Sequence, residues 1–153
     1  MAIVAGWMRV LVSVAILGAV APPPALAAEA VTVVRFADAP NHRSPDGLTL
    51  ARLLLGPASG RPPGGLHVGS LILKRGAAVA KHSHAESDEI VVLLKGEVEM
   101  IAGGEIHQLK APLALLIPRG VEHSFRVIRA AEAVQIYSPA GPEARFKVWP
   151  EAG

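Results

Sequence analysis

From Leu66 onward, short apolar runs alternate with turn-forming residues along the chain. Runs of this length, bounded by glycine, proline and small polar residues, are typical of the strands of an all-β sandwich or barrel. Gly103 and Gly104 predict a tight hairpin, because glycine adopts positive φ without a Cβ penalty. The predicted strands are Leu66–Lys74, Ala78–His84, Glu89–Lys95, Glu97–Ala102, Glu105–Leu109, Leu113–Ile117, His123–Ile128 and Ala133–Ser138.

The chain before Leu66 has a less regular pattern. The valine-rich run Ala30–Ala37 predicts a first strand, and Asp38–Gly47 is rich in turn formers. Leu48–Leu55 has no clean period of two and is a strand or a short helix, and we favour a strand because of its neighbours. Gly56–Gly65 cannot hold regular structure and is predicted to be a loop. This loop is a connector or a flap over the mouth of the barrel, and we favour the connector.

The first thirty residues have the pattern of a secretory signal. Arg9 precedes an apolar run, Val10–Val20, and a proline break, Pro22–Pro24, is followed by a small-residue sequence that ends at Ala27. We expect cleavage after Ala27 and a periplasmic or secreted protein with no stable membrane anchor. A retained anchor is the alternative, although the apolar run is short for a membrane span. The mature chain then divides into residues 28–65, with the first strands and the Gly/Pro-rich loop, and residues 66–153, with the barrel and a C-terminal tail.

The composition is that of one domain. The 153 residues are 51% hydrophobic and 18% charged, which is enough apolar material for a single core. Removal of residues 1–27 takes away Arg9 and no acidic residue, which leaves 14 basic against 13 acidic residues and a formal charge of +1. Aromatic residues make up only 4%, and there is no basic stripe, so nothing favours nucleic-acid binding. The absence of cysteine excludes disulfides and thiolate metal sites.

Candidate chemistry is concentrated between Gly76 and Gly96. Successive side chains of a strand point to opposite faces, so His82 and His84 are predicted to project to the same side. Glu89 begins the next apolar strand, and alternation places it at the open end of the same cavity. Imidazole and carboxylate ligands suit one divalent transition metal: iron, manganese, nickel, copper or zinc. A single Arg9, not a pair, favours export of an unfolded chain, whose site is loaded outside the cytoplasm, where copper and zinc are favoured.

This segment resembles the first motif of the cupin superfamily, G-x5-H-x-H-x4-E-x6-G, with all five marked positions filled. The second motif, G-x5-P-x-G-x2-H-x3-N, is matched by Pro118, Gly120 and His123. Pro112 and Val127 stand where the family has glycine and asparagine. Neither position is a metal ligand in the family, so these departures bear on turn geometry more than on metal binding.

The resemblance covers roughly residues 66–139 and implies a small single-domain bacterial cupin. The implied fold is a double-stranded β-helix, or jelly-roll barrel, of two antiparallel sheets. The implied metal ligands are His82, His84, Glu89 and His123. His42 lies in the turn-rich segment and is predicted to be a solvated loop residue, and His107, just past the hairpin turn, is predicted to be exposed. His67 matches no ligand position in the family pattern, and we leave His67 and His107 out of the metal set.

Other side chains are predicted to lie near this site. Alternation puts Phe125 on the face of His123, where it forms an apolar wall or packs in the core. Gln135 and Tyr137 share one face of a late strand, so they line the substrate pocket or face solvent. The tail carries Phe146 and two further apolar residues, which we expect to pack on the outside of the barrel or against a second subunit. A homodimer is therefore one expected partner, and a small-molecule ligand is the other.

Four ligands on an octahedral metal leave two positions for water, dioxygen or a bidentate substrate. The first hypothesis is a metal-dependent oxygenase, with isomerase or lyase chemistry as alternatives. Glu89 is the ligand best suited to act also as a proton acceptor, which makes it the candidate catalytic residue. The second hypothesis is a non-catalytic module that binds a sugar, a phenolic compound or the metal itself. A purely structural barrel is the third.

Overall fold

Antiparallel strands make up most of residues 31–152, the part of the chain that this computed structural model describes. The predicted all-β class is confirmed, and no helix within those residues is long and apolar enough to cross a membrane. The predicted secretory segment, residues 1–27, lies outside the described residues. The strands are β1 (Asn41–Arg43), β2 (Thr49–Leu55), β3 (His67–Leu73), β4 (Ala78–His82), β5 (Asp88–Ala102), β6 (Glu105–Lys110), β7 (Leu113–Ile117) and β8 (His123–Ser138).

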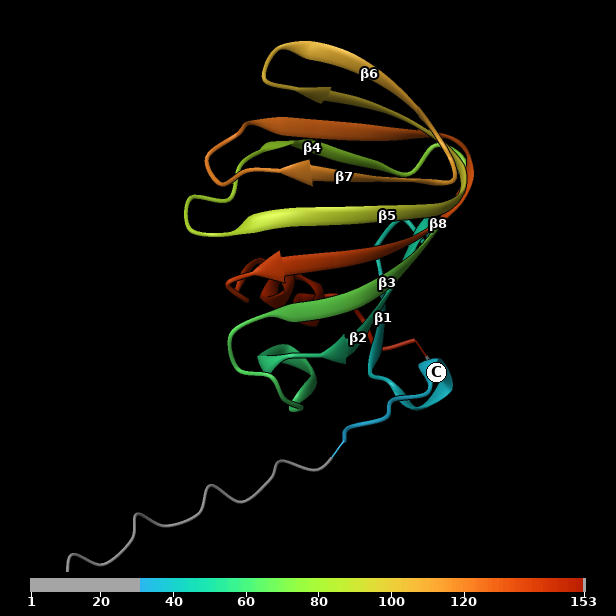
Figure 1. The fold of residues 1–153 in the computed structure, drawn as a ribbon. Helices are drawn as coiled ribbons and strands as arrows, with labels where there is room; N and C mark the ends of the chain where they lie inside the picture. The colour runs from blue at the N-terminus through green and yellow to red at the C-terminus, as the bar shows by residue number, and fades with distance from the viewer. Residues whose placement is uncertain (1–30, 153) are drawn as a thin grey trace, which may run out of the picture. The chain divides into compact units, whose positions relative to one another are not determined.

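The strands form two layers that share the long strands β5 and β8 (Figure 1). In one layer neighbouring strands pair in the order β1, β2, β3, the second half of β8, the first half of β5 and β7. The other layer pairs β4 with the first half of β8, then with the second half of β5 and with β6. The predicted jelly roll of two antiparallel sheets is thus confirmed.

The sequence predicted β5 and β8 as two strands each, and this prediction was wrong. Each strand passes without a break from one layer to the other, and their pairing shifts register around Lys95 and Glu97. Gly96 lies at this bend with φ of +92°, and a Cβ atom there would lie 2.4 Å from the carbonyl oxygen of Ala130. A bulge and a glycine bend a strand without ending it, whereas a turn ends it. The polar residues at the bend resemble those of a turn, which is why the sequence predicted two strands.

The N-terminal part of the described chain also differs from the prediction. Residues 31–35 form no strand and lead into a short 3-10 helix, η1 (Phe36–Asp38). Val31 and Val33 are 90% and 79% exposed, because no apolar surface covers them. Instead β1 lies in the predicted turn region and pairs with β2, whose strand assignment is confirmed. His42, predicted to be a solvated loop residue, lies in β1 and is only 5% exposed. The predicted loop after β2 contains a 3-10 turn, η2 (Pro57–Ser59).

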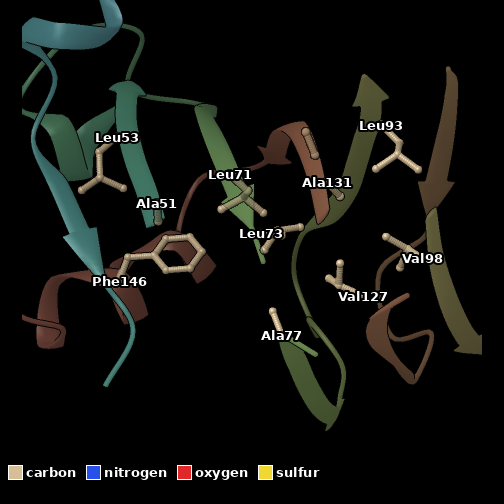
Figure 2. Close-up of a cluster of buried hydrophobic side chains, with 11 residues drawn as sticks. Ala51, Leu53, Leu71, Leu73, Ala77, Leu93, Val98, Val127, Ala131 and Phe146 are labelled. Atoms are coloured by element: carbon tan, nitrogen blue, oxygen red, sulfur yellow. The ribbon is translucent and has the colours of Figure 1, made fainter. Parts of the chain in front are cut away.

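The core lies between the layers and includes one residue of the C-terminal tail. Side chains from β2, β3, β5 and β8 point into one cluster, and Phe146 joins them from the 3-10 helix η3 (Pro142–Val148) (Figure 2). Phe146 is 3% exposed, and its ring lies 5.0 Å from that of Trp149. The tail therefore closes the core of its own chain with Phe146, while Val148 remains 83% exposed.

Candidate metal centre

Four side chains that are far apart in sequence converge at one end of the barrel. Each offers one ligand atom, and these atoms all lie within 4.8 Å of one another; the residues are His82, His84, Glu89 and His123. His82 is the last residue of β4 and pairs with His123, the first residue of β8. Glu89 lies near the start of β5, so the ends of three strands build the cluster.

His84 reaches the cluster from a loop and not from a strand. The predicted strand ran to His84, but β4 ends at His82, and His84 lies in the connection to β5. Its carbonyl oxygen accepts a hydrogen bond from the backbone N–H of Gly120 at 2.8 Å, which ties this connection to the turn before β8. The His82 and His84 rings are 4.9 Å apart. The proximity of His82 and His84 therefore depends on this loop contact and not on strand alternation.

Backbone carbonyls fix the orientation of two imidazoles. The Nδ1 atom of His82 lies 2.8 Å from the carbonyl oxygen of Ala80, and that of His123 lies 2.9 Å from the carbonyl oxygen of Val121. A carbonyl only accepts, so each Nδ1 carries the proton and donates. In the neutral imidazole the lone pair is then on Nε2, the nitrogen that faces the cluster, which is the tautomer that a metal ligand requires.

Glu89 occupies the middle of the cluster and is only 4% exposed. Its Oε2 atom lies 3.2 Å from Nε2 of His84 and 3.2 Å from Nε2 of His123. Its Oε1 atom accepts a hydrogen bond of 2.6 Å from Nε2 of Gln135. Glu89 Oε2 and His84 Nε2 are buried and lack a hydrogen bond of good geometry, although they are close to each other. Two buried polar atoms that converge in this way fit a shared cation.

The charges of these groups follow from their neighbours. Burial favours the neutral acid of Glu89, but His123, His84 and Gln135 stabilise its anion more strongly and lower its pKa well below the usual range. Burial lowers the pKa of His82. Burial also opposes the charged form of His123, yet the contact with Glu89 raises its pKa. One carboxylate among three imidazoles is a donor set that suits a divalent transition metal, and these residues therefore fit such an ion.

The three predicted pocket residues lie around this cluster in different ways. Phe125 and Gln135 line a narrow cavity of about 30 Å³ in the barrel interior, together with Glu89 and His123. Phe125 also lines a larger cavity of about 240 Å³. Tyr137 is fully buried and packs edge-on against His84, with ring centroids 5.1 Å apart. Gln135 acts on Glu89 directly, which makes it a positioning residue for the carboxylate.

Sequence reasoning missed two charged residues of the tail. Nη1 of Arg145 lies 3.4 Å from Nε2 of His82, and its Nη2 donates to the Tyr137 hydroxyl at 3.2 Å. Glu143 is 2% exposed and its Oε1 lies 3.9 Å from Nδ1 of the fully buried His67. His67 was placed outside the metal set, and it does lie outside the four-residue cluster. No spacing rule connects the tail to these strands, because their contact exists only in the folded chain.

Comparison with known proteins places this arrangement in a family. The cupin domain model matches residues 69–137. Protein SchB of Streptomyces halstedii is 30% identical over 105 residues, which cover 69% of this chain and 74% of that protein. The chain belongs to the cupin family. Polyketide synthase CurC of Streptomyces cyaneus is 32% identical over 78 residues, 50% of this chain, and the chain spans only 51% of that relative's length.

Solved structures share the fold at low sequence identity. An RmlC-like cupin from Shewanella frigidimarina superposes with a TM-score of 0.61 at 18% identity, over 74% of this chain and 96% of that one. A predicted oxalate decarboxylase from Thermotoga maritima superposes with a TM-score of 0.60 at 21% identity, over 71% of this chain and 100% of that one. At these identities the likeness concerns the fold alone.

Proposed function

We propose that this cupin is an exported metal-dependent enzyme that acts on a small organic substrate, with oxygenase chemistry as the first expectation. The observation that carries the proposal is the convergence of three imidazoles and one carboxylate within 4.8 Å, with Glu89 and His123 buried. Burying a carboxylate among histidines costs free energy unless a charge partner is present. A bound divalent cation would be that partner, and it would supply Lewis-acid or redox chemistry at its remaining coordination positions.

The protein groups have separate tasks in this proposal. Two backbone carbonyls hold the Nδ1 protons of His82 and His123 and so keep Nε2 free to bind. Gln135 holds Glu89 through Oε1 and leaves Oε2 facing the cluster. The lowered pKa of Glu89 keeps it ionised. A carboxylate of low pKa is a weak base, so this property supports the role of ligand more than that of proton acceptor.

Elemental analysis of the purified protein tests the metal site. We expect one iron, manganese, nickel, copper or zinc ion per chain in the wild type, and loss of this ion in the His82→Ala and His123→Ala variants, because each removes one ligand. His107→Ala is the matched control, since His107 lies outside the cluster, and it should retain the metal. Wild-type protein that takes up none of the five metals on reconstitution would contradict the proposal.

The alternative is a binding module without turnover. The cavity of about 240 Å³ is lined mainly by apolar side chains, which suits binding of a small ligand whether or not chemistry follows. Oxygen consumption by the metal-loaded protein with small phenolic and enol compounds separates the two functions. Uptake that depends on His123 supports the oxygenase, whereas saturable binding without product favours the module.

Export is part of the proposal and is supported by the apolar segment and the Ala25-Leu26-Ala27 sequence that follows the proline break. We expect the protein in the periplasm or the medium, with a mature N-terminus at Ala28. Mass spectrometry of the intact protein from those fractions measures this. An intact N-terminal segment in the membrane fraction would instead indicate the anchor.

A further inference from the structure

A cationic side chain of the tail lies at the edge of the metal centre. Arg145 directs Nη1 toward Nε2 of His82 at 3.4 Å and Nη2 toward the Tyr137 hydroxyl at 3.2 Å. Its Nε atom is buried and has no hydrogen-bond partner. A buried donor on a charged group without an acceptor costs free energy, so this guanidinium is prepared to accept a further partner.

The position of Arg145 is set by the residues on either side of it. Glu143 is buried, and its Oε2 accepts a hydrogen bond of 2.7 Å from the backbone N–H of Gly141. Its other oxygen lies 3.9 Å from Nδ1 of His67 in β3. Phe146 follows Arg145 and is buried in the core. The short helix η3 is therefore fixed at both sides of Arg145, and the Tyr137 hydroxyl accepts a hydrogen bond from its guanidinium.

Metal binding would change the partners of this guanidinium. Nδ1 of His82 is engaged with the carbonyl of Ala80, so Nε2 is the atom left for a cation. A lone pair that binds a cation cannot also accept from Arg145. Nη1 and Nε would then both lack an acceptor beside a centre in which Glu89 is the only anionic ligand. The divalent cation and the Arg145 guanidinium are positive and only the Glu89 carboxylate among the ligands is negative. The excess of positive charge favours an anion at this place.

A cavity next to Arg145 provides space for the rest of such a ligand. It has a volume of about 240 Å³ and is lined by Arg145 together with apolar and aromatic side chains, among them Phe125, Phe146 and Trp149. Asp46 also lines it, and its carboxylate, which accepts from the Ser44 hydroxyl and the backbone N–H of Leu48, keeps its negative charge. The anionic group of a ligand is therefore expected at the Arg145 end of the cavity and its apolar part elsewhere. A cavity of about 150 Å³ holds benzene, so this one has room for a single ring with a short acidic arm.

We propose that Arg145, positioned by Tyr137, binds the anionic group of a small organic acid whose apolar body lies in the cavity beside the metal centre. The substrate class is thus a carboxylate, or an acidic enol, with one ring or an equivalent apolar group. Guanidinium and carboxylate match each other as a two-point hydrogen-bonded pair. This inference rests on the proposed metal-dependent function and specifies the substrate of that same site.

Calorimetric titration of the zinc-loaded full chain with benzoate, phenylacetate and neutral benzamide tests the anion site. We expect saturable binding of at least one of the acids to the wild type, tighter than binding of benzamide. In Arg145→Gln the binding of that acid should weaken roughly tenfold or more, with benzamide unaffected, because the charge-assisted pair is lost. Arg129→Gln is the matched control, since Arg129 is an exposed arginine of β8 that pairs with Glu97, and it should bind the acid as the wild type does.

Three results would overturn the proposal: no acid binds the wild type, benzamide binds as tightly as the acids, or Arg145→Gln binds the acid unchanged. If Arg145→Gln does not fold, Arg145→Lys takes its place, and unchanged binding by that variant likewise counts against a two-point pair. The zinc content of each sample is measured first. Wild type that takes up none of the five metals would refute the metal-dependent function and with it this inference, whereas metal-loaded wild type that binds no acid would overturn the anion site alone.

Discussion

At the residue scale, the site depends on groups that orient the ligands as much as on the ligands themselves. The ring nitrogen with which His82 or His123 faces the cluster is decided by a backbone carbonyl two residues earlier in the chain. The carboxylate of Glu89 is held in the same way by the amide of Gln135. Such partners raise metal affinity because they hold the ligand atoms in place before the metal binds.

Gln135→Leu should weaken zinc binding by roughly tenfold or more, as is usual when an outer hydrogen-bond partner of a ligand is removed. The reason is that Oε1 of Glu89 would lose its 2.6 Å hydrogen bond and the carboxylate would be free to rotate. Competition with a chromogenic chelator measures the affinity. Gln108→Leu serves as the control, because Gln108 makes the same type of bond to Glu99, which lies outside the cluster. Equal affinities in the two variants would show that Gln135 does not position Glu89.

At the element scale, the bend shared by β5 and β8 is the feature on which both layers depend. Each long strand contributes one half to each sheet, so the ligands at their starts, Glu89 and His123, are held by pairing in different layers. At the bend the backbone of β5 approaches Ala130 and Ala131 so closely that only glycine fits at position 96. Strand continuity therefore depends on one residue without a side chain.

Gly96→Ala should lower the free energy of unfolding by about 3 kcal/mol or more, the sum of strain at positive φ and steric overlap with β8. Chemical denaturation measures the change. Gly76→Ala is the matched control, because Gly76 has a similar φ of +88° but no atom within 4 Å of its added Cβ. This control should cost only about 1 kcal/mol. A similar loss in both variants would mean that the close approach of β8 contributes nothing.

At the scale of the whole molecule, the C-terminal tail connects the core to the candidate metal centre. Phe146 packs in the core, and its neighbour Arg145 contacts His82 and Tyr137. Core packing and site geometry therefore depend on the same short helix. The sequence predicted that Phe146 packs on the outside of the barrel or against a second subunit. The structure instead buries it in the core of its own chain.

Phe146→Ala should destabilise the fold by about 3–5 kcal/mol, the usual cost of removing a buried phenylalanine. It should also weaken binding of organic acids, because η3 would no longer hold Arg145 in place. Thermal and chemical denaturation measure the first effect and calorimetry the second. Val148→Ala, which alters a side chain that is 83% exposed, should change stability by no more than about 0.5 kcal/mol. Full retention of acid binding in a folded Phe146→Ala protein would argue against this coupling.

The amino-acid sequence alone determined the strand-rich fold class and the four residues that form the cluster, because alternation and motif spacing act over short distances along the chain. Only the tertiary structure decided what depends on contacts between distant segments. His84 is placed by a loop contact with Gly120. Strand β5 continues through a bend whose polar residues resemble a turn in the sequence. Packing of the tail brings Arg145 to the site and brings Glu143 to the buried His67. A local sequence pattern predicts the face of a strand on which a side chain lies, but it does not predict which distant segment of the chain packs over that face.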